Sequence, residues 1–329
     1  MSSMNDDWIE CVRWCHAGED QDSVAALIET LADVCQRSSY SAPILTKQRD
    51  TLGIRVGGYV VLYSGALASI GNLRSTSSGD ELDQELLVGL AKDLFQEAFA
   101  AGAEMVQAIS PLIPSTVSND PVTAFVSPNP KRDAALQAAG MVAVAKLVQM
   151  ECIGISTIPR LSIPASSLEC SEIAFTPHHQ VSSNRWSQVV ESTYAETLDV
   201  PELNGLRNID NTLVGYASTM DGDPKTWWIA QCQGIDIGCL LLTPTEDRYC
   251  ELTYLGLVPA WRGKGISKII MNFVRDWALQ CGIEGITLAV DLRNTPAIRL
   301  YQACGFMTQQ FVQAWICFPP SFRSSNPEP

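Results

Sequence analysis

The feature that most constrains this chain is a strand that runs directly into a basic glycine loop and an amphipathic helix. The apolar strand covers 249–258, and helix 265–280 has apolar residues at helical spacing along one face. The loop and the first helical residues are Arg262, Gly263, Lys264, Gly265, Ile266 and Ser267. Glycines permit a tight turn close to a ligand, and the first N–H groups of a helix lie unpaired at the positive end of its dipole. We therefore predict that these residues form a cradle for phosphate.

The loop does not complete the better-known nucleotide-binding motifs. It contains no GxxxxGK[ST], and the residues from Gly263 to Lys268 do not complete GxGxxG. Taken alone, a basic glycine turn is more often only a turn. The segments that follow extend the pattern, because strand 285–291 precedes a helix that begins near Asn294 and carries Pro296 in its first turn.

Taken together, Pro259, the strand before it, the glycine loop and the N-x-x-A-x-x-x-Y run from Asn294 to Tyr301 resemble the GCN5-related N-acetyltransferase (GNAT) family. The resemblance covers about the last half of the chain. It implies that the loop binds the pyrophosphate of acetyl-coenzyme A. The Gln or Arg that the family usually has three residues before the first glycine is Ala260 here. Arg262 and Lys264 still supply positive charge.

The resemblance also implies how the rest of the donor is held. In this family a bulge in the central strand splays two strands apart, and the pantetheine arm lies in the gap. By position, Leu257 and Val258 would offer backbone groups to that arm. Asn294 either bonds the arm or only caps its helix. Tyr301 would be the general acid, because a phenol with a pKa of about 10 can protonate a thiolate whose conjugate acid has a pKa of about 8.5. The alternative is that Tyr301 is only a core residue.

Glu251, eight residues before Pro259 on the central strand, is the candidate base. An amine acceptor binds as ammonium at neutral pH, so a group must remove a proton before attack. Related enzymes use a strand glutamate in a similar place, although a glutamate at a strand edge can also be merely solvated. Tyr254 is the second candidate. The family recognises its acceptor with the first helices and their loop, here 184–208. The side chains of that region suited to a cation are Tyr194, Glu196, Asp199 and Glu202.

The two halves of the chain repeat a pattern. Residues 95–109 match 274–288, and 135–141 match 300–306. Two copies of one fold are the simplest account of this repeat. We predict an α/β (α+β) chain of two tandem GNAT-like domains, each with a mixed, mostly antiparallel twisted sheet flanked by helices. The predicted boundaries are a first domain over 1–155, a linker over 156–170 and a second domain over 171–329.

The two predicted domains differ in their chemistry. The glycine loop of the second is replaced in the first by the acidic stretch 77–85, which would repel a pyrophosphate. Leu136 stands in the place of Tyr301. We therefore expect the first domain to be degenerate and non-catalytic. One active copy beside a degenerate one resembles the arrangement in the mycothiol synthases.

Periodicity predicts the remaining elements. The predicted helices are 20–36, 81–101, 183–197 and 265–280. The predicted hairpins are 53–62 with 64–71, and 226–234 with 235–243. Single strands are predicted at 172–175, 249–258 and 285–291.

Composition limits the partners. The net charge of −14 argues against nucleic acid, because a phosphate-binding surface must be basic. No stretch is apolar enough to span a bilayer, and the first residues are acidic and polar, so we expect a cytoplasmic protein. The eleven cysteines include no CxxC pair and are expected to be reduced thiols. Cys11, Cys15 and His16 lack a fourth ligand, so no metal is predicted.

These observations predict an acetyl-CoA-dependent N-acetyltransferase. The partners are acetyl-CoA and a primary amine, which we expect to belong to a small molecule. A protein or peptide acetyltransferase and a non-catalytic acyl-CoA-binding regulator are the alternatives. The sequence does not indicate the acceptor's identity or the oligomeric state.

Overall fold

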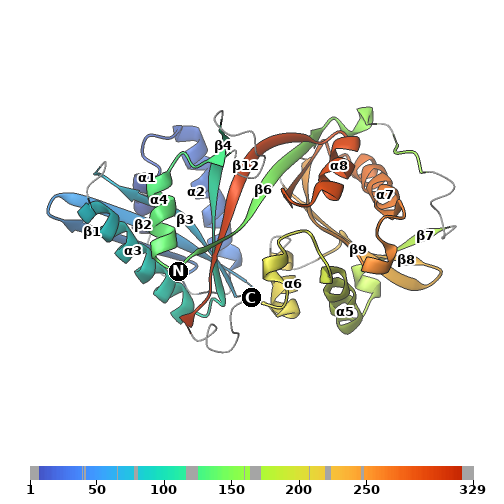
Figure 1. The fold of residues 1–329 in the computed structure, drawn as a ribbon, viewed down its shortest axis with the longest axis horizontal. Helices are drawn as coiled ribbons and strands as arrows, with labels where there is room; N and C mark the ends of the chain where they lie inside the picture. Colours follow the sequence, from blue (N-terminus) through green and yellow to red (C-terminus); the bar gives the residue numbers. More distant parts are fainter. Residues whose placement is uncertain are drawn as a thin grey trace. The chain divides into compact units, whose positions relative to one another are not determined.

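A computed structural model describes residues 7–320 apart from 39, 41, 65, 78–80, 116–124, 159, 164–171, 207, 219–223 and 246–247. The chain forms two compact units (Figure 1). Unit 1 consists of Met1–Val144 with Gln313–Pro329, and unit 2 consists of Ala145–Val312. Each unit therefore includes a segment from the other half of the sequence.

Unit 1 is a sheet with two helices on each face. Its strands are β1 (Ile44–Thr51), β2 (Ile54–Tyr63), β3 (Leu67–Ser75), β4 (Met105–Pro114), the short β5 (Phe125–Val126) and the end of β12 (Met307–Cys317). Its helices are α1 (Asp7–Cys15), α2 (Gln21–Arg37), α3 (Glu81–Ala100) and α4 (Pro130–Ala138). Alternate residues of β2 face opposite ways, so Val60 packs under α3 and α4 while Val61 packs under α1 and α2.

Unit 2 repeats this plan, a sheet with two helices on each face. Its strands lie in the order β6 (Val142–Ile153), β11 (Gly285–Asp291), β10 (Tyr249–Leu257), β9 (Ile235–Pro244), β8 (Trp227–Cys232) and β7 (Ile173–Pro177). Its helices are α5 (Ser183–Tyr194), α6 (Ile209–Ser218), α7 (Ile266–Cys281) and α8 (Thr295–Ala303). Leu240 and Leu242 of β9 pack with α7 and α8, while Cys239 and Leu241 pack with α5 and α6. The sheet therefore separates two helical layers.

The repeat predicted from the sequence is visible in the pairing. In unit 1, β3 and β4 are parallel over three residue pairs, from Leu67–Met105 to Ser69–Gln107. In unit 2, β10 and β11 are also parallel over three pairs, from Tyr249–Gly285 to Glu251–Thr287. The other registered pairs are antiparallel. The predicted mixed, mostly antiparallel sheets flanked by helices are confirmed.

Most predicted elements agree with the structure to within a few residues. Among the elements that patterning did not identify are α1, α6 and β1. The two long strands β6 and β12 end the two halves of the sequence, yet Ala145–Ile153 of β6 belongs to unit 2 and Gln313–Cys317 of β12 belongs to unit 1. Strand β6 pairs with β11 along seven residues, from Gly285–Ile153 to Asp291–Leu147. The predicted domains, divided at 155 and 171, are continuous stretches of sequence, whereas unit 1 combines Met1–Val144 with Gln313–Pro329.

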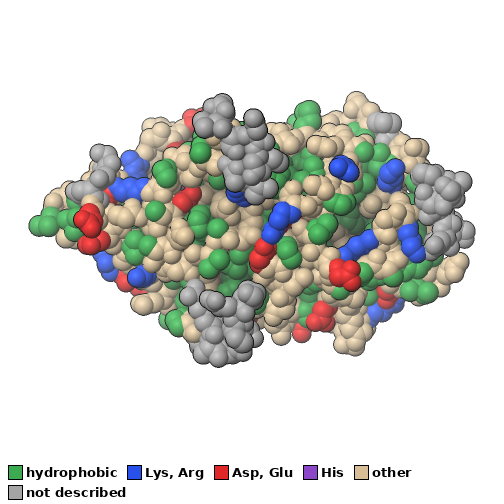
Figure 2. Space-filling view, viewed as in Figure 1, with side chains coloured by type: hydrophobic (Ala, Val, Ile, Leu, Met, Phe, Trp, Pro, Cys, Tyr) green, Lys and Arg blue, Asp and Glu red, His purple; other side chains and the backbone are tan. Residues whose placement is uncertain are grey.

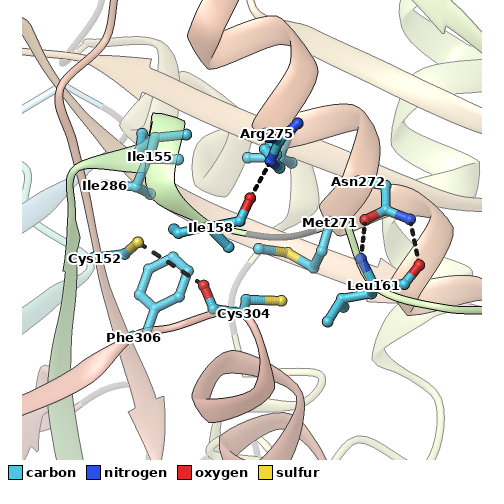
Figure 3. Close-up of a pocket in the computed structure, with 11 residues that line it drawn as sticks. Cys152, Ile155, Ile158, Leu161, Met271, Asn272, Arg275, Ile286, Cys304 and Phe306 are labelled. Atoms are coloured by element: carbon cyan, nitrogen blue, oxygen red, sulfur yellow. Dashed lines mark hydrogen bonds between the residues drawn. The ribbon is translucent and has the colours of Figure 1, made fainter.

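The first part of the predicted linker packs against α7 (Figure 3). Asn272 accepts a hydrogen bond from the Leu161 N–H (2.8 Å) and donates one to the Leu161 carbonyl (3.0 Å). Arg275 Nε donates to the Ile158 carbonyl at 2.7 Å. The cavity behind these contacts measures only about 20 Å³, room for one water at most. It is a packing defect of the core. Residues 164–170 of the predicted linker lie outside the described residues.

Several global properties follow from the described residues. None of their helices has the length and apolar composition of a membrane span. On the face shown in Figure 2, several basic side chains lie beside acidic ones.

The cysteines were expected to be reduced thiols. Those described as free thiols agree with this expectation, but Cys232 is disulfide-bonded, so the expectation is wrong for that residue.

Candidate active site

The site is built where two parallel strands separate. Strands β10 and β11 pair only as far as Glu251 and Thr287, although β10 continues to Leu257 and β11 to Asp291. A register shift between Leu252 and Tyr254 marks a bulge in β10, where it pairs with β9. A bulge bends its strand and increases the local twist, which turns the end of β10 away from β11.

A cavity of about 500 Å³ occupies this divergence. Its walls come from β10, from β11, from the glycine loop, from α8 and from the loop after α5. The lining residues used below are Asp199, Leu257, Arg262, Gly263, Ser267, Asn294 and Tyr301. The cavity is the size of a typical small-molecule site.

The glycine loop forms one end of the cavity. Gly263 and Gly265 have φ angles of +74° and +76°, which residues with a side chain adopt at a cost. Gly265 is the N-cap of α7 and makes no side-chain cap hydrogen bond. A Cβ added to Gly263 would meet no other atom within 4 Å. The start of α7 is therefore accessible to an anion.

The other predicted loop residues have different surroundings. Ser267 lines the cavity, whereas Ile266 is buried in the core beside α8. The Lys264 ammonium lies 5.3 Å from the centre of the Trp261 ring. Of these three side chains, only that of Ser267 lines the cavity.

Leu257 and Val258 present their backbones in opposite directions. The Val258 N–H donates to the Ile237 carbonyl of β9 at 3.0 Å. Since successive residues of a strand alternate, the N–H of Leu257 points towards the gap, and its carbonyl accepts a hydrogen bond from Arg262 Nε at 2.9 Å. Leu257 is thus the better placed of the two to bond a ligand in the gap, and the Val258 amide is already used.

Arg262 was predicted to supply positive charge to the pyrophosphate, but its side chain is engaged elsewhere. Its guanidinium donates to four backbone carbonyls, which belong to Leu257 (2.9 Å), Thr193 (2.9 Å), Ala195 (2.7 Å) and Glu196 (2.8 Å). The carbonyls of Thr193 and Ala195 lie in the last turn and at the C-cap of α5, and that of Glu196 follows the helix. The side chain therefore joins the glycine loop to the loop after α5.

Asn294 and Tyr301 lie together on α8. Asn294 is the N-cap, and its Oδ1 accepts a hydrogen bond from the Ala297 N–H at 3.3 Å. It also lines the cavity, so capping and ligand contact are compatible. Tyr301 is buried, with a 7% exposed surface, and its pKa is raised by that burial and by the nearby Asp199 carboxyl. The phenol therefore stays protonated at neutral pH.

Glu251 faces the opposite side of the sheet. Its neighbours Cys250 and Leu252 are buried on the α7 side, so Glu251 points away from α7. It lines a second cavity of about 360 Å³ together with Gln149, Glu151, Thr287 and Gln309. Gln309 donates to Glu151 at 2.9 Å. The Glu251 side chain remains open to solvent, yet the cavity walls remove enough water to raise its pKa.

Glu251 and Tyr301 therefore line different cavities. Ala289 of β11 lines both. The two candidate catalytic side chains lie on opposite faces of one sheet, beside the same gap. Tyr254 is poorly suited as a base, because its hydroxyl is hydrogen-bonded to Thr193 Oγ1 at 2.9 Å and burial raises its pKa well above the usual value.

The loop after α5 is held by Asp291 and Arg293, which the sequence analysis did not identify, together with Asp199 and Glu202, which it assigned to a cationic acceptor. Asp199 accepts a hydrogen bond from the Asp291 N–H at 2.7 Å, and the Asp291 carboxylate accepts one from the Val200 N–H at 3.1 Å. Arg293 bridges Asp291 and Glu202 at 2.6 and 2.5 Å. Burial raises the pKa of Asp199. The charged residues Asp291 and Arg293 at the end of strand 285–291 were the sequence signal that could have identified this attachment.

The corresponding helix start in unit 1 is occupied by a side chain of its own. Asp83, in the first turn of α3, is fully buried and forms an ion pair with Lys131 and a hydrogen bond with Ser75. Its carboxylate takes the place where an anion would be favoured. Leu136 is buried in the core. Residues 78–80 of the acidic stretch lie outside the described residues.

Residues 182–306 match the model of the acetyltransferase (GNAT) family. This range contains β10, the glycine loop, α7 and α8, which build the cavity. The part of the chain that builds the cavity is therefore similar to the GNAT family. Streptothricin acetyltransferase from Escherichia coli is 31% identical over 70 residues, which are 21% of this chain and 40% of that protein. Mycothiol acetyltransferase from Renibacterium salmoninarum is 33% identical over 76 residues, 23% of this chain and 22% of that protein.

The solved structures extend the likeness of the fold to both units. A tandem GNAT protein from the clavulanic acid biosynthesis pathway has a TM-score of 0.51 and 12% identity, and the match covers 99% of this chain and 97% of that one. A GCN5-related N-acetyltransferase from Sphaerobacter thermophilus has a TM-score of 0.52 and 16% identity, with 80% and 76% covered. The prediction of two tandem GNAT-like domains is confirmed at the level of the fold. The chain spans less than half the length of the curated relatives described above.

Proposed function

We propose that unit 2 transfers an acetyl group from acetyl-CoA to a primary amine of a small molecule, by direct attack of the amine on the thioester. The observation that carries this proposal is the cavity of about 500 Å³ that joins the start of α7 to the gap between β10 and β11. A donor with a pyrophosphate near one end and a thioester at the other suits a cavity of this form.

The donor would be held by the glycine loop and the strand gap. Gly263, Gly265 and Ser267 would bind the pyrophosphate through the amides that begin α7 and through the serine hydroxyl. Leu257 would pair with the pantetheine arm through its backbone, and Asn294 would contact the same arm. Lys264 would contribute charge rather than a fixed contact.

The chemistry would proceed through the gap, from one face of the sheet to the other. Glu251, on the α5 side, would accept the proton of the bound ammonium group, and the neutral amine would then attack the thioester carbon. A backbone N–H near Leu257 would stabilise the negative oxygen of the intermediate. Tyr301, on the α7 and α8 side, would give its proton to the departing sulfur, and the proton lost from the attacking nitrogen as the amide forms would return to the Tyr301 oxygen directly or through solvent. The base would thus act on the amine, and the acid would act on the departing sulfur.

The acceptor is proposed to be a small amine. Asp199 on the first cavity and Glu151 with Glu251 on the second give both entrances carboxylates that attract a cation. Two of the relatives are named for streptothricin and mycothiol, and neither name is that of a protein.

An acetyl-CoA turnover screen tests this function, with released thiol as the readout and with amines, aminoglycosides, amino-sugar thiols and peptides as acceptors. We expect turnover with at least one small amine and little with peptides. Faster turnover of peptides would instead identify a peptide acetyltransferase. Binding of acetyl-CoA without turnover of any acceptor would identify a non-catalytic acyl-CoA-binding protein.

A further inference from the structure

Arg262 immediately precedes the first loop glycine, and charge alone would assign it to the pyrophosphate. The geometry indicates otherwise. Its guanidinium makes four hydrogen bonds, each between 2.7 and 2.9 Å, to the backbone carbonyls of Leu257, Thr193, Ala195 and Glu196. Carbonyls at a helix C-terminus carry partial negative charge and lack helical partners, so a guanidinium satisfies them well.

The segment that Arg262 holds is strained. Glu196 has a φ of +53° and Val200 a φ of +43°, and a β-branched residue is rarely found in that region. Such a conformation persists only when its surroundings enforce it. Arg262 binds the carbonyl of Glu196, and Asp291 accepts the N–H of Val200 at 3.1 Å. The strained residues therefore coincide with two points of attachment.

The residues between these attachments form a wall of the cavity. Glu196, Thr197, Leu198 and Asp199 all line it. The conformation of 196–200 consequently decides where the Asp199 carboxylate lies relative to Tyr301.

We propose that Arg262 is a positioning residue that clamps loop 195–200 against the glycine loop and thereby shapes the acceptor side of the site. Its role is not to bind the pyrophosphate. The assignment of loop 195–200 to the acceptor side rests on the proposed function, whereas the clamp itself is a property of the free protein. The second attachment, through Asp291 and Arg293, holds the far end of the same loop.

Lys264 offers a matched control, since Lys264→Ala removes one positive charge from the same loop without touching these carbonyls. Hydrogen exchange measured on the peptide 194–200 reads the clamp directly, because the N–H groups of Thr197, Asp199 and Val200 are hydrogen-bonded in the loop. We expect exchange there to rise at least about tenfold in Arg262→Ala and to stay unchanged in Lys264→Ala.

Two further measurements separate shape from charge. Calorimetry should show acetyl-CoA affinity within about threefold of the parent for Arg262→Ala and a larger loss for Lys264→Ala. The KM of the best amine from the turnover screen should rise at least about tenfold in Arg262→Ala alone. Arg262→Lys keeps the charge but cannot reach four carbonyls, so it should share the exchange and KM changes.

Unchanged exchange in both Arg262 variants would overturn the proposal, as would a loss of acetyl-CoA affinity in Arg262→Ala equal to that in Lys264→Ala. Full recovery in Arg262→Lys would also overturn it, because charge alone would then suffice. If the parent protein turns over no amine, the proposed function fails, yet the exchange and affinity comparisons still decide the role of Arg262.

Discussion

Glu251 and Thr287 are the last paired residues of strands β10 and β11. Beyond this pair the two strands separate, and the cavity of about 500 Å³ lies between them. The same Glu251 side chain opens onto the second cavity, on the opposite face of the sheet. This pair therefore marks the point where a donor on one face and an acceptor on the other could meet.

The first prediction concerns the glycine loop. Gly263→Asp should weaken acetyl-CoA binding at least about tenfold, or ~1.4 kcal/mol, because it places a negative charge beside the start of α7. The side chain enters open space, so the fold should persist. Calorimetry on the purified variant measures the affinity.

Gly263→Asn is the control for this change. Asn and Asp tolerate the positive φ of +74° about equally, so the variants differ mainly in charge. Asn should stay within about threefold of the parent affinity. Parent-like binding by Gly263→Asp would remove the cradle assignment, and equal weakening by Asn would point to backbone strain.

The second prediction concerns the base. Glu251→Gln should lower kcat about 10²-fold or more, since an amide cannot take the ammonium proton. The rising limb of the pH–rate profile should lie above the ordinary glutamate pKa of about 4.3, because burial raises the pKa of Glu251. Glu151→Gln removes a charge from the same cavity and should leave kcat within about threefold. Equal losses of kcat in the two variants would indicate that the negative charge of the cavity matters, rather than proton transfer to Glu251.

Thermal unfolding supplies an independent check on Glu251. A carboxyl with a raised pKa in the folded state favours protonation, so this group opposes folding above that pKa and the penalty falls as pH decreases through it. Glu251→Gln should therefore be at least as stable as the parent at pH 7. A clear loss of stability would mean that the carboxylate makes favourable native contacts.

The third prediction concerns the acid. Tyr301→Phe should lower kcat about 10²-fold with little change in acetyl-CoA affinity, because the hydroxyl acts when the thiolate leaves. Burial and Asp199 raise the pKa of Tyr301, so any falling limb that it causes should lie above about pH 10, its ordinary value. A loss below about threefold in both Tyr301→Phe and Glu251→Gln would mean that neither residue carries the chemistry.

The fourth prediction concerns the repeat. Calorimetry should find one acetyl-CoA per chain, because the Asp83 carboxylate, paired with Lys131, already occupies the start of α3. Asp83→Asn should reduce stability by ~1–3 kcal/mol through loss of the charged contacts, without creating a second site. Two equivalents per chain, or turnover that survives Gly263→Asp and is lost in Asp83→Asn, would assign the chemistry to unit 1.

Much of the candidate site was accessible from the sequence. Gly263, Ser267, Asn294 and Tyr301 line the cavity, because a glycine loop, a helix start and a capped helix are local features with local signals. The position of Arg262 was not accessible in this way. Its charge suggested a phosphate, but its partners are carbonyls of residues 193, 195 and 196, about 70 positions earlier in the chain. No local pattern encodes a contact of that separation.

The sequence by itself determined most of the secondary structure, the repeat and the glycine loop. Each of these depends on periodicity, turn residues and caps within a few positions. Only the tertiary structure decided which strands complete each sheet. Leu147–Ile153 of β6 pairs with β11 in unit 2, and Trp315 of β12 donates to Ser110 of β4 at 3.1 Å in unit 1. Because backbone hydrogen bonds are the same for every residue, an apolar strand carries little information about its partner, and the packing of the whole sheet selects it.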